Sequence, residues 1–198
     1  MTRRLILASA SPQRAKLLDQ LGVAHVAIAA DIDETPRPGE SAEALAERLA
    51  RGKAQSLDQT LAERYGDDAV LGSDTVVALG DRLYGKPADD AEAESMLASL
   101  SGTTHRVVSG VALCVDGHCV SRISTSAVTM RETTRAERAA YIASGEPMGK
   151  AGGYAIQGRG AIFIARLDGS YSSVMGLPLF ETAALLDEAG FDLLGALS

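Results

Sequence analysis

The stretch from Leu5 to Gly22 constrains the fold more than any other, because it has the pattern of a buried strand followed at once by a helix. Leu5–Ala8 is an apolar run that is too short for a helix and suits a buried strand. Ser11 is placed to cap a helix that begins at Pro12, a position where the missing N–H costs nothing. Gly22 is a natural end for this helix. The stretch therefore predicts a β-α unit.

The turn between this strand and helix has the composition of an anion site. Ser9 and Ser11 supply hydroxyl groups, and the first N–H groups of a helix point out of such a turn without helical partners. Arg14 can hold a phosphate through two parallel hydrogen bonds. Its charge opposes the helix dipole, which favours a compensating anion nearby. The alternative is an ordinary β-α junction with a surface arginine, and this stretch alone leaves both open.

Length and charge limit the classes of function. The 198 residues suffice for one sizeable domain or two small lobes. The net charge of −7 gives no global field that would attract nucleic acid or an anionic membrane. No apolar run approaches the ~20 residues of a membrane-spanning helix, and the first residues do not resemble a signal peptide. We expect a soluble, cytoplasmic protein with neither nucleic acid nor membrane as a partner.

The two cysteines flank a predicted hairpin. Asp116-Gly117 is a strong two-residue turn signal, which would place Cys114 directly across from Cys119. Thiols so placed are close enough to oxidise, but cytosolic thiols are normally kept reduced. The three histidines show no zinc-ligand spacing with these cysteines. We expect both to be structural thiols.

A long helix is predicted from Ser41, its N-cap, to about Leu57. Leu45, Leu49 and Lys53 follow one another at four-residue spacing, so a lysine lies on the face that the leucines mark as buried. The commoner explanation is a lysine at the edge of the core that extends its amine to solvent. The alternative is an ammonium group that reaches from this face into a cleft.

The strand predicted from Ala69 to Leu79 carries a carboxylate at its centre. Apolar residues on both sides of Ser73-Asp74-Thr75 indicate a central strand. A carboxylate buried there costs free energy unless it is paired, hydrogen-bonded or bound to a metal. Asp74 is therefore a candidate functional group, and a structural, hydrogen-bonded aspartate is the alternative.

Further signals mark the rest of the chain. The glycine-rich segment Lys150–Gly160 lets the backbone approach a ligand closely, with a simple run of turns as the alternative. We find no repeat or flexible linker, so we expect one domain over residues 1–198. The other predicted elements are a strand at 23–30, an acidic turn at 31–36, a turn at Gly80-Asp81 that sends the chain back through 82–84, and β-rich segments at 104–115 and 118–130. Further predictions are helices opened by capping boxes at Asp89/Glu92 and Thr134/Glu137, a hairpin turn at Asp168-Gly169 and a helix at 179–189.

Five motifs in order together resemble the Maf family of nucleoside triphosphate pyrophosphatases, also labelled septum-formation proteins. The match runs from Leu5 to about Leu186, nearly the whole chain. The resemblance implies an α/β fold similar to that of the inosine triphosphatase group, with a mixed, strongly twisted sheet, flanking helices and two lobes around a deep cleft. The motifs are Leu7–Arg14, Gly72–Val77, Gly85–Pro87, Lys150–Gly158 and Gly169–Leu179.

The resemblance also implies a reaction and a set of residues. Water would cleave a nucleoside triphosphate into the monophosphate and pyrophosphate with a divalent metal, Mg²⁺ first, with Mn²⁺ or Co²⁺ as alternatives. Asp74 would be the proton acceptor and a metal ligand, and Glu34 would be a further ligand of the metal or of water. The residues implied to bind the substrate are Ser9, Ser11, Arg14, Lys53, Lys86 and Lys150.

Three positions separate the branches of the family. The branch that acts on dTTP and UTP has Arg, Thr and Gln there, and the branch that acts on 7-methyl-GTP has Trp, Gln and Glu. This chain has Gln13, Thr75 and Gln157, so two positions match the dTTP/UTP branch and Gln13 matches neither. The alternatives are a Maf enzyme of other or broad base preference and a non-catalytic, nucleotide-sensing division regulator. A homodimer is the default expectation for a soluble enzyme.

Overall fold

A computed structural model describes residues 3–65 and 68–194 of the chain, without the side chains of residues 60–65. The strands are β1 (Leu5–Ala8), β2 (His25–Ile28), β3 (Ala69–Leu79), β4 (Arg82–Tyr84), β5 (Thr104–Val115), β6 (His118–Met130) and β7 (Ile164–Asp168). The α-helices are α1 (Pro12–Asp19), α2 (Ala42–Tyr65), α3 (Asp90–Leu100), α4 (Arg135–Ile142), α5 (Tyr171–Met175) and α6 (Leu179–Glu188), and the 3₁₀ helices are η1 (Ala151–Gly153) and η2 (Arg159–Phe163).

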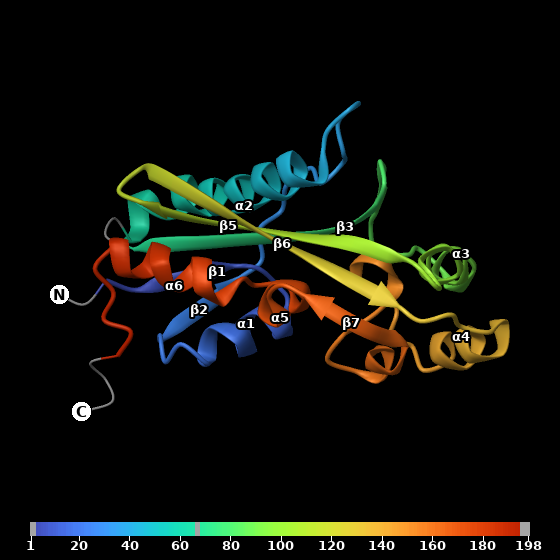
Figure 1. The fold of residues 1–198 in the computed structure, drawn as a ribbon. Coiled ribbons are helices and arrows are strands. Elements are labelled where there is room, and N and C mark those ends of the chain that lie inside the picture. The colour runs from blue at the N-terminus through green and yellow to red at the C-terminus, as the bar shows by residue number, and fades with distance from the viewer. Residues whose placement is uncertain (1–2, 66–67, 195–198) are drawn as a thin grey trace.

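The strands form one mixed, seven-stranded sheet in the order β2-β1-β3-β5-β6-β7, with β4 paired to β3. β1 lies parallel to both β2 and β3, and the remaining pairs are antiparallel. Figure 1 shows the long strands β3, β5 and β6 running through the molecule and twisting across one another. The expected mixed, twisted sheet with flanking helices is confirmed.

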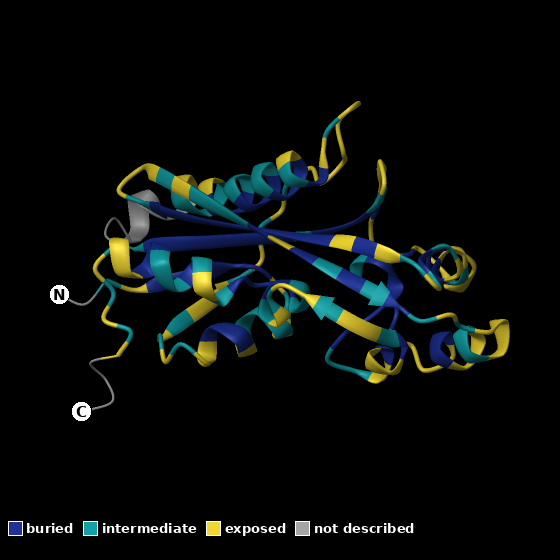
Figure 2. Ribbon diagram, viewed as in Figure 1, coloured by how far each residue is buried: buried dark blue, intermediate teal, exposed yellow. Residues whose placement is uncertain are grey.

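Helices cover both faces of this sheet. α2 packs its alanine and leucine face against one side of β3 and β5. α1 and α6 pack against the opposite side, around Leu5 and Leu71. A further core at the other end of the long strands gathers residues of α3 and α4 around Phe163. Figure 2 shows β3 buried along almost its whole length, as expected for a central strand that runs between these layers.

Two glycines bring α2 unusually close to the sheet. A Cβ atom at Gly72 of β3 would overlap the carbonyl oxygen of Ala50, and one at Gly110 of β5 would overlap the carbonyl oxygen of Ala46. Both obstacles are helix backbone, which cannot swing aside as a long side chain does. The close approach brings the next turns of α2, which carry Lys53, against the middle of β3.

The edge of β3 that faces β1 is open in its centre. β1 pairs with Ala69–Leu71 and then ends at Ala8, whereas β4 pairs only from Val77 onward. Between these partners the segment 72–76 has no neighbouring strand on that side. In α/β sheets, ligands bind in such crevices, where strand order or strand partners change.

Local signals located most of the elements. Ser11 caps α1 and Pro12 is its first residue, and the Asp116-Gly117 turn joins β5 to β6 with both residues at positive φ. The box of Thr134 and Glu137 is present at α4. No helix within residues 3–65 and 68–194 combines the length and apolar character that a membrane crossing requires.

The structure corrects several details. Asp168-Gly169 is not a hairpin turn, because Ser170 caps α5 directly after β7. Asp89 caps α3, but Glu92 bonds the N–H of Ala88 and not that of the cap, so the box is incomplete. α2 continues beyond Leu57 to Tyr65, and β2 is shorter than the predicted strand at 23–30.

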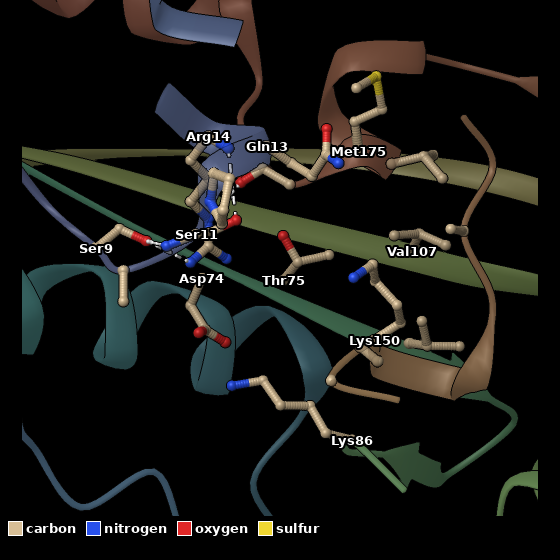
Figure 3. Close-up of a pocket in the computed structure, with 18 of the residues that line it drawn as sticks. Ser9, Ser11, Gln13, Arg14, Asp74, Thr75, Lys86, Val107, Lys150 and Met175 are labelled. Carbon is tan, nitrogen blue, oxygen red and sulfur yellow. Dashed lines mark hydrogen bonds between the residues drawn. The ribbon is translucent and has the colours of Figure 1, made fainter. Parts of the chain in front are cut away.

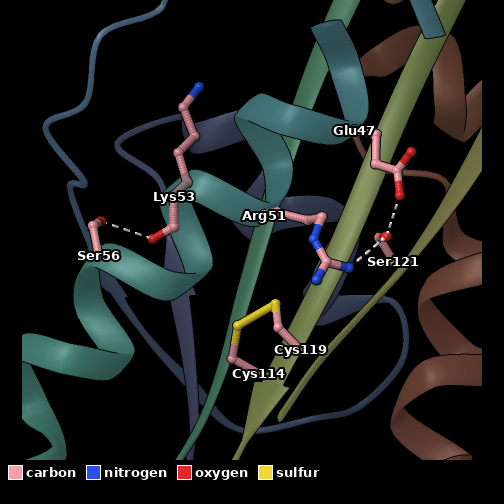
Figure 4. The surroundings of a disulfide bond; sticks show 7 residues. All are labelled: Glu47, Arg51, Lys53, Ser56, Cys114, Cys119 and Ser121. Atoms are coloured by element: carbon pink, nitrogen blue, oxygen red, sulfur yellow. Dashed lines mark hydrogen bonds between the residues drawn. A yellow bond between two sulfur atoms is a disulfide. The ribbon is translucent and has the colours of Figure 1, made fainter. Parts of the chain in front are cut away.

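The cysteines are opposite each other as predicted, but they are not free thiols. Cys114 and Cys119 are cross-strand partners with Cα atoms 4.0 Å apart, and a disulfide joins them (Figure 4). The hairpin turn fixes this register, so the two side chains face each other across the strands. Beside the disulfide, Arg51 of α2 donates to Ser121 of β6 at 3.1 Å, which ties the helix to this hairpin.

Candidate active site

A cavity of about 530 Å³ lies beside the open edge of β3. Its wall combines the β1–α1 turn, the centre of β3, one residue of α2, the turn after β4 and the glycine-rich segment (Figure 3). The sequence-predicted site residues all line this one cavity: Ser9, Ser11, Gln13, Arg14, Glu34, Lys53, Asp74, Thr75, Lys86, Lys150 and Gln157. Segments spread over nearly 150 residues therefore meet at one place.

The β1–α1 turn is held by its own hydroxyl groups. Ser9 Oγ accepts from the N–H of Ser11 at 3.1 Å, and Ser11 Oγ accepts from the N–H of Arg14 at 3.5 Å. The guanidinium of Arg14 donates through Nε to the carbonyl oxygen of Gly176 at 2.8 Å and through Nη1 to Ser9 Oγ at 3.4 Å. The arginine is thus fixed at the cavity wall, and among the described residues its Nη2 has no hydrogen-bond partner.

Lys53 joins two carboxylates inside the cavity. Its Nζ lies 2.6 Å from Asp74 Oδ1 and 2.6 Å from Glu34 Oε1, and only 6% of the residue is exposed. Lys86 approaches the other oxygen of Glu34 at 3.8 Å. The ammonium therefore does not extend to solvent, and the carboxylate of Asp74 is paired, as its burial requires.

The charges in this cluster act on one another. Partial burial of Glu34 opposes its ionisation, but the hydrogen bond and charge of Lys53, with the charges of Lys86 and Arg14, outweigh it and lower the pKa of Glu34. Burial lowers the pKa of Arg14, and the charges of Asp74 and Glu34 partly offset this. Glu34 is therefore ionised at neutral pH, and the cavity concentrates cations in a chain that is acidic overall.

The carboxylates of Glu34 and Asp74 are of the ligand type that a divalent metal takes. Both present carboxylate oxygens to one cation, the ammonium of Lys53, so they already converge on a positive charge. In the part of the chain that the structure describes, no group of three or more His, Cys, Asp or Glu could hold a metal. Mg²⁺ commonly uses only one or two carboxylates together with substrate phosphates, so this pair suffices for it.

The turn after α5 is tied to the sheet by buried hydroxyl groups. Ser73 Oγ lies 2.8 Å from the carbonyl oxygen of Gly110 and 3.0 Å from that of Gly176, and the two oxygens share its one hydrogen. Ser109 Oγ donates to the carbonyl oxygen of Ser173 at 2.7 Å. Gly176 has a φ of 120°, which favours glycine, and its carbonyl also receives Arg14. This turn therefore fixes the orientation of Arg14 through a direct hydrogen bond.

The glycine-rich segment is fixed at several points. Gly152, at a φ of 70°, packs on Val77, and its N–H donates to the carbonyl oxygen of Gly85 at 3.0 Å. The hydroxyl of Tyr154 lies 2.7 Å from His105 Nε2 in the core. Burial lowers the pKa of His105 to about 4, so the imidazole is neutral at physiological pH.

Glu146 holds the end of this segment. Its carboxylate accepts the N–H groups of Arg159 and Gly160, each at 2.9 Å, and the hydroxyl of Tyr141 at 2.9 Å. The same hydroxyl accepts the N–H of Ala155 at 3.1 Å. Burial opposes ionisation of Glu146, but these donors and the charge of Arg159 lower its pKa below the ordinary value. The four contacts bracket the residues that carry Gln157.

Sequence reasoning missed Ser109, His105 and Glu146. Ser109 is a polar residue in the buried, apolar part of β5, the same signal that identified Asp74 in β3. His105 was considered only as a zinc ligand. Glu146 stands in an exposed-looking turn, and nothing local indicates that its partners lie 13 and 14 residues further along the chain.

Comparison with known proteins identifies the following similar chains. The chain is 51% identical over 197 residues to a dTTP/UTP pyrophosphatase of Cupriavidus metallidurans, covering 96% of this chain and 98% of that protein. It is 51% identical over 189 residues to a dTTP/UTP pyrophosphatase of Myxococcus xanthus, covering 96% and 94%. The solved structure of a nucleoside-triphosphatase / dITP/XTP pyrophosphatase from Mycobacterium abscessus aligns with a TM-score of 0.43 at 16% identity, covering 93% and 94%.

The model of the Maf-like protein family matches residues 4–189. This range contains the whole sheet, all residues of the cavity and the turn after α5. The chain belongs to the Maf family.

Proposed function

We propose that this protein hydrolyses dTTP and UTP to the nucleoside monophosphate and pyrophosphate. Relatives about half identical to it over nearly their full lengths are named for that activity. The observation that carries the proposal is the group of Lys53, Asp74 and Glu34, in which one ammonium lies 2.6 Å from each of two carboxylates inside a cavity. Such a group combines a base with charge neutralisation, the two requirements for attack on a polyphosphate.

The triphosphate binds across the cationic part of the cavity. The β1–α1 turn presents hydroxyl groups and the N-terminus of α1, and Arg14 adds a fixed guanidinium. Lys86 and Lys150 face the same space. These groups neutralise the phosphates and hold the leaving pyrophosphate in line with the attacking water.

Asp74 accepts the proton of the attacking water. Its Oδ1 is bound by Lys53, and among the described residues its Oδ2 has no hydrogen-bond partner and is available to the water. As the proton moves to this carboxylate, the water oxygen bonds to the α-phosphorus. The bond from that phosphorus to the oxygen that bridges it to the β-phosphorus breaks, and the electron pair leaves with pyrophosphate.

Glu34 and Asp74 are the residues we propose to hold the divalent metal, Mg²⁺ in first place. When bound, the metal supplies positive charge to the phosphate oxygens. Lys53, which now joins the two carboxylates, would shift toward the phosphates as the nucleotide enters. Its Nζ lies within hydrogen-bond distance of both carboxylates, and a change of its side-chain rotamer would release them.

Gln157 and Thr75 are the residues we propose to read the base. The NH₂ group of Gln157 can donate to a carbonyl oxygen of the acceptor–donor–acceptor edge that uracil and thymine share, which leaves the central N3–H of the base to another acceptor. A cationic 7-methylguanine would instead favour a carboxylate at this position. Gln13 has no charge, so we expect a weaker hold on the phosphates than an arginine would give, with base preference unchanged.

The test is a panel of dTTP, UTP, CTP, GTP and 7-methyl-GTP with Mg²⁺, in which pyrophosphate is measured separately from orthophosphate. We expect pyrophosphate from dTTP and UTP, and Asp74→Asn should lower turnover by about two to four orders of magnitude. Gln157→Glu should lower kcat/KM for both substrates roughly tenfold to a hundredfold, because one hydrogen-bond partner is lost. A preference of the parent enzyme for 7-methyl-GTP, or orthophosphate as the product, would refute the proposal.

A further inference from the structure

Three hydroxyl and carbonyl groups form a chain that begins at the cavity wall. Thr75 Oγ1 lies 2.7 Å from Ser109 Oγ, and Ser109 Oγ lies 2.7 Å from the carbonyl oxygen of Ser173. Thr75 lines the cavity (Figure 3) and is half-buried, whereas its partner Ser109 is fully buried. These two hydrogen bonds therefore link the cavity wall to the backbone of α5.

The direction of each hydrogen bond in this chain is fixed by proton counting. The carbonyl oxygen of Ser173 can only accept, so Ser109 must give it its single hydroxyl hydrogen. Ser109 Oγ then has only lone pairs left for its other partner. Thr75 must therefore donate its own hydrogen to Ser109, since two lone pairs 2.7 Å apart would repel each other.

The consequence for the cavity is that Thr75 Oγ1 presents lone pairs and no hydrogen. Among the described residues its oxygen has no partner besides Ser109. A ligand group that meets this oxygen must be a donor, because an acceptor placed there would leave both groups unpaired in a half-buried site. Thr75 is thus an acceptor of fixed polarity, although a threonine hydroxyl in isolation is both donor and acceptor.

We propose that Ser109 is a positioning residue that gives the site its preference for uracil and thymine over cytosine. This rests on the proposed function. The ring nitrogen N3 carries a hydrogen in uracil and thymine, and it is a bare acceptor in cytosine. Ser109 takes the hydroxyl hydrogen of Thr75, so only lone pairs of Thr75 Oγ1 face the base. These lone pairs accept the N3–H of uracil and thymine and repel the N3 lone pair of cytosine.

Gln157 cannot make this distinction by itself. A rotation of its amide by half a turn exchanges the oxygen and the NH₂ group, so the same side chain can serve either pyrimidine. Among the described residues no hydrogen bond holds that amide in one orientation, whereas the hydroxyl of Thr75 is held in one. Discrimination between two bases of equal size requires a hydrogen-bonding group whose orientation is fixed, as that of the Thr75 hydroxyl is.

The experiment compares kcat/KM for UTP and CTP in the parent enzyme and in Ser109→Ala, with Ser124→Ala as the matched control. Ser124 is the cross-strand partner of Ser109 in β6, and its hydroxyl takes no part in the hydrogen bonds that link Thr75, Ser109 and Ser173. Removing the hydroxyl of Ser109 frees that of Thr75 to donate to N3 of cytosine. We expect the UTP/CTP ratio to fall about tenfold or more, in part through an absolute gain with CTP, the size typical of one mismatched hydrogen bond. The control should keep the parental ratio.

Two further variants support the test if Ser109→Ala folds poorly. Thr75→Ser retains the hydroxyl and should retain the ratio, whereas Thr75→Val removes the acceptor at similar volume and should lose most of it. An unchanged ratio in Ser109→Ala, or an equal loss with both nucleotides, would overturn the role of Ser109 while the proposed function stands. A parent enzyme that does not prefer UTP to CTP would instead refute the proposed base preference.

Discussion

The pairing of Lys53 with Asp74 predicts a specific dependence of stability on both side chains. Lys53→Met keeps the length and apolar stem of the lysine but removes the ammonium. Asp74 then remains as a carboxylate with a side chain only 12% exposed and without a positive partner at 2.6 Å. Removing one partner of a buried pair typically lowers the free energy of unfolding by about 3–5 kcal/mol. Because Glu34 is 43% exposed and regains solvent, we expect a loss of about 3 kcal/mol.

That loss should be visible without unfolding the protein at room temperature. Domains are typically stable by about 5–15 kcal/mol, and for a chain of this length each kcal/mol shifts Tm by about 2–4 °C, so we expect Tm to fall by roughly 6–12 °C. Asp74→Asn should cost less, because Lys53 retains Glu34. The double variant should be less destabilised than the sum of the two, by about 1–3 kcal/mol, because it leaves no unpaired charge at the buried position 74.

The assay is urea unfolding of the four nucleotide-free proteins at pH 7.5, with the free energy of unfolding extrapolated from each curve. Equal slopes of the curves would show that the changes reflect stability alone. If the two single changes add within about 0.5 kcal/mol, Lys53 and Asp74 do not interact in solution, and the reasoning about the site is wrong. The same proteins provide the turnover measurements that test Asp74 as the base.

Three further predictions rest on other parts of the site. Gly110→Ala forces a Cβ into the carbonyl oxygen of Ala46, so we expect the free energy of unfolding to fall by about 1–3 kcal/mol, and Tm and turnover to fall with it. A parental Tm would contradict the close approach of α2. Burial lowers the pKa of His105 to about 4 from 6.5, so the unfolded chain binds the proton first and stability falls as the pH drops between these values. His105→Gln should reduce the loss between pH 7.5 and 4.5 by roughly 2.5 kcal/mol in urea unfolding, and an identical pH profile would argue against burial of a neutral imidazole. Glu146→Gln places an NH₂ group against an N–H of Arg159 or Gly160, so the segment that carries Gln157 is held less firmly. We therefore expect KM for dTTP, measured by steady-state kinetics, to rise about tenfold. An unchanged KM would show that the Glu146 carboxylate does not position that segment.

The sequence alone determined the elements whose signals are local. The apolar run Leu5–Ala8 predicted β1, and the cap Ser11 with Pro12 predicted the start of α1. The Asp116-Gly117 turn predicted the register of β5 and β6. The polar residue Asp74 inside an apolar strand identified the central group of the site. These features follow from backbone preferences and from the cost of burying charge, which act within a few residues. The order of the motifs, by resemblance, supplied the family and the residue roles.

Tertiary structure decided what depends on contacts between distant segments. Only the folded sheet leaves the edge of β3 open at 72–76, and only the close packing of α2 carries Lys53 to both carboxylates. The local signal at Asp168-Gly169 predicted a hairpin, but bonds from Ser170 to its own helix and to Ser126 of β6 favour α5 instead. The polarity of Thr75 is set by a serine 34 residues away. Such properties belong to pairs of groups that the chain brings together only on folding, so no local pattern contains them.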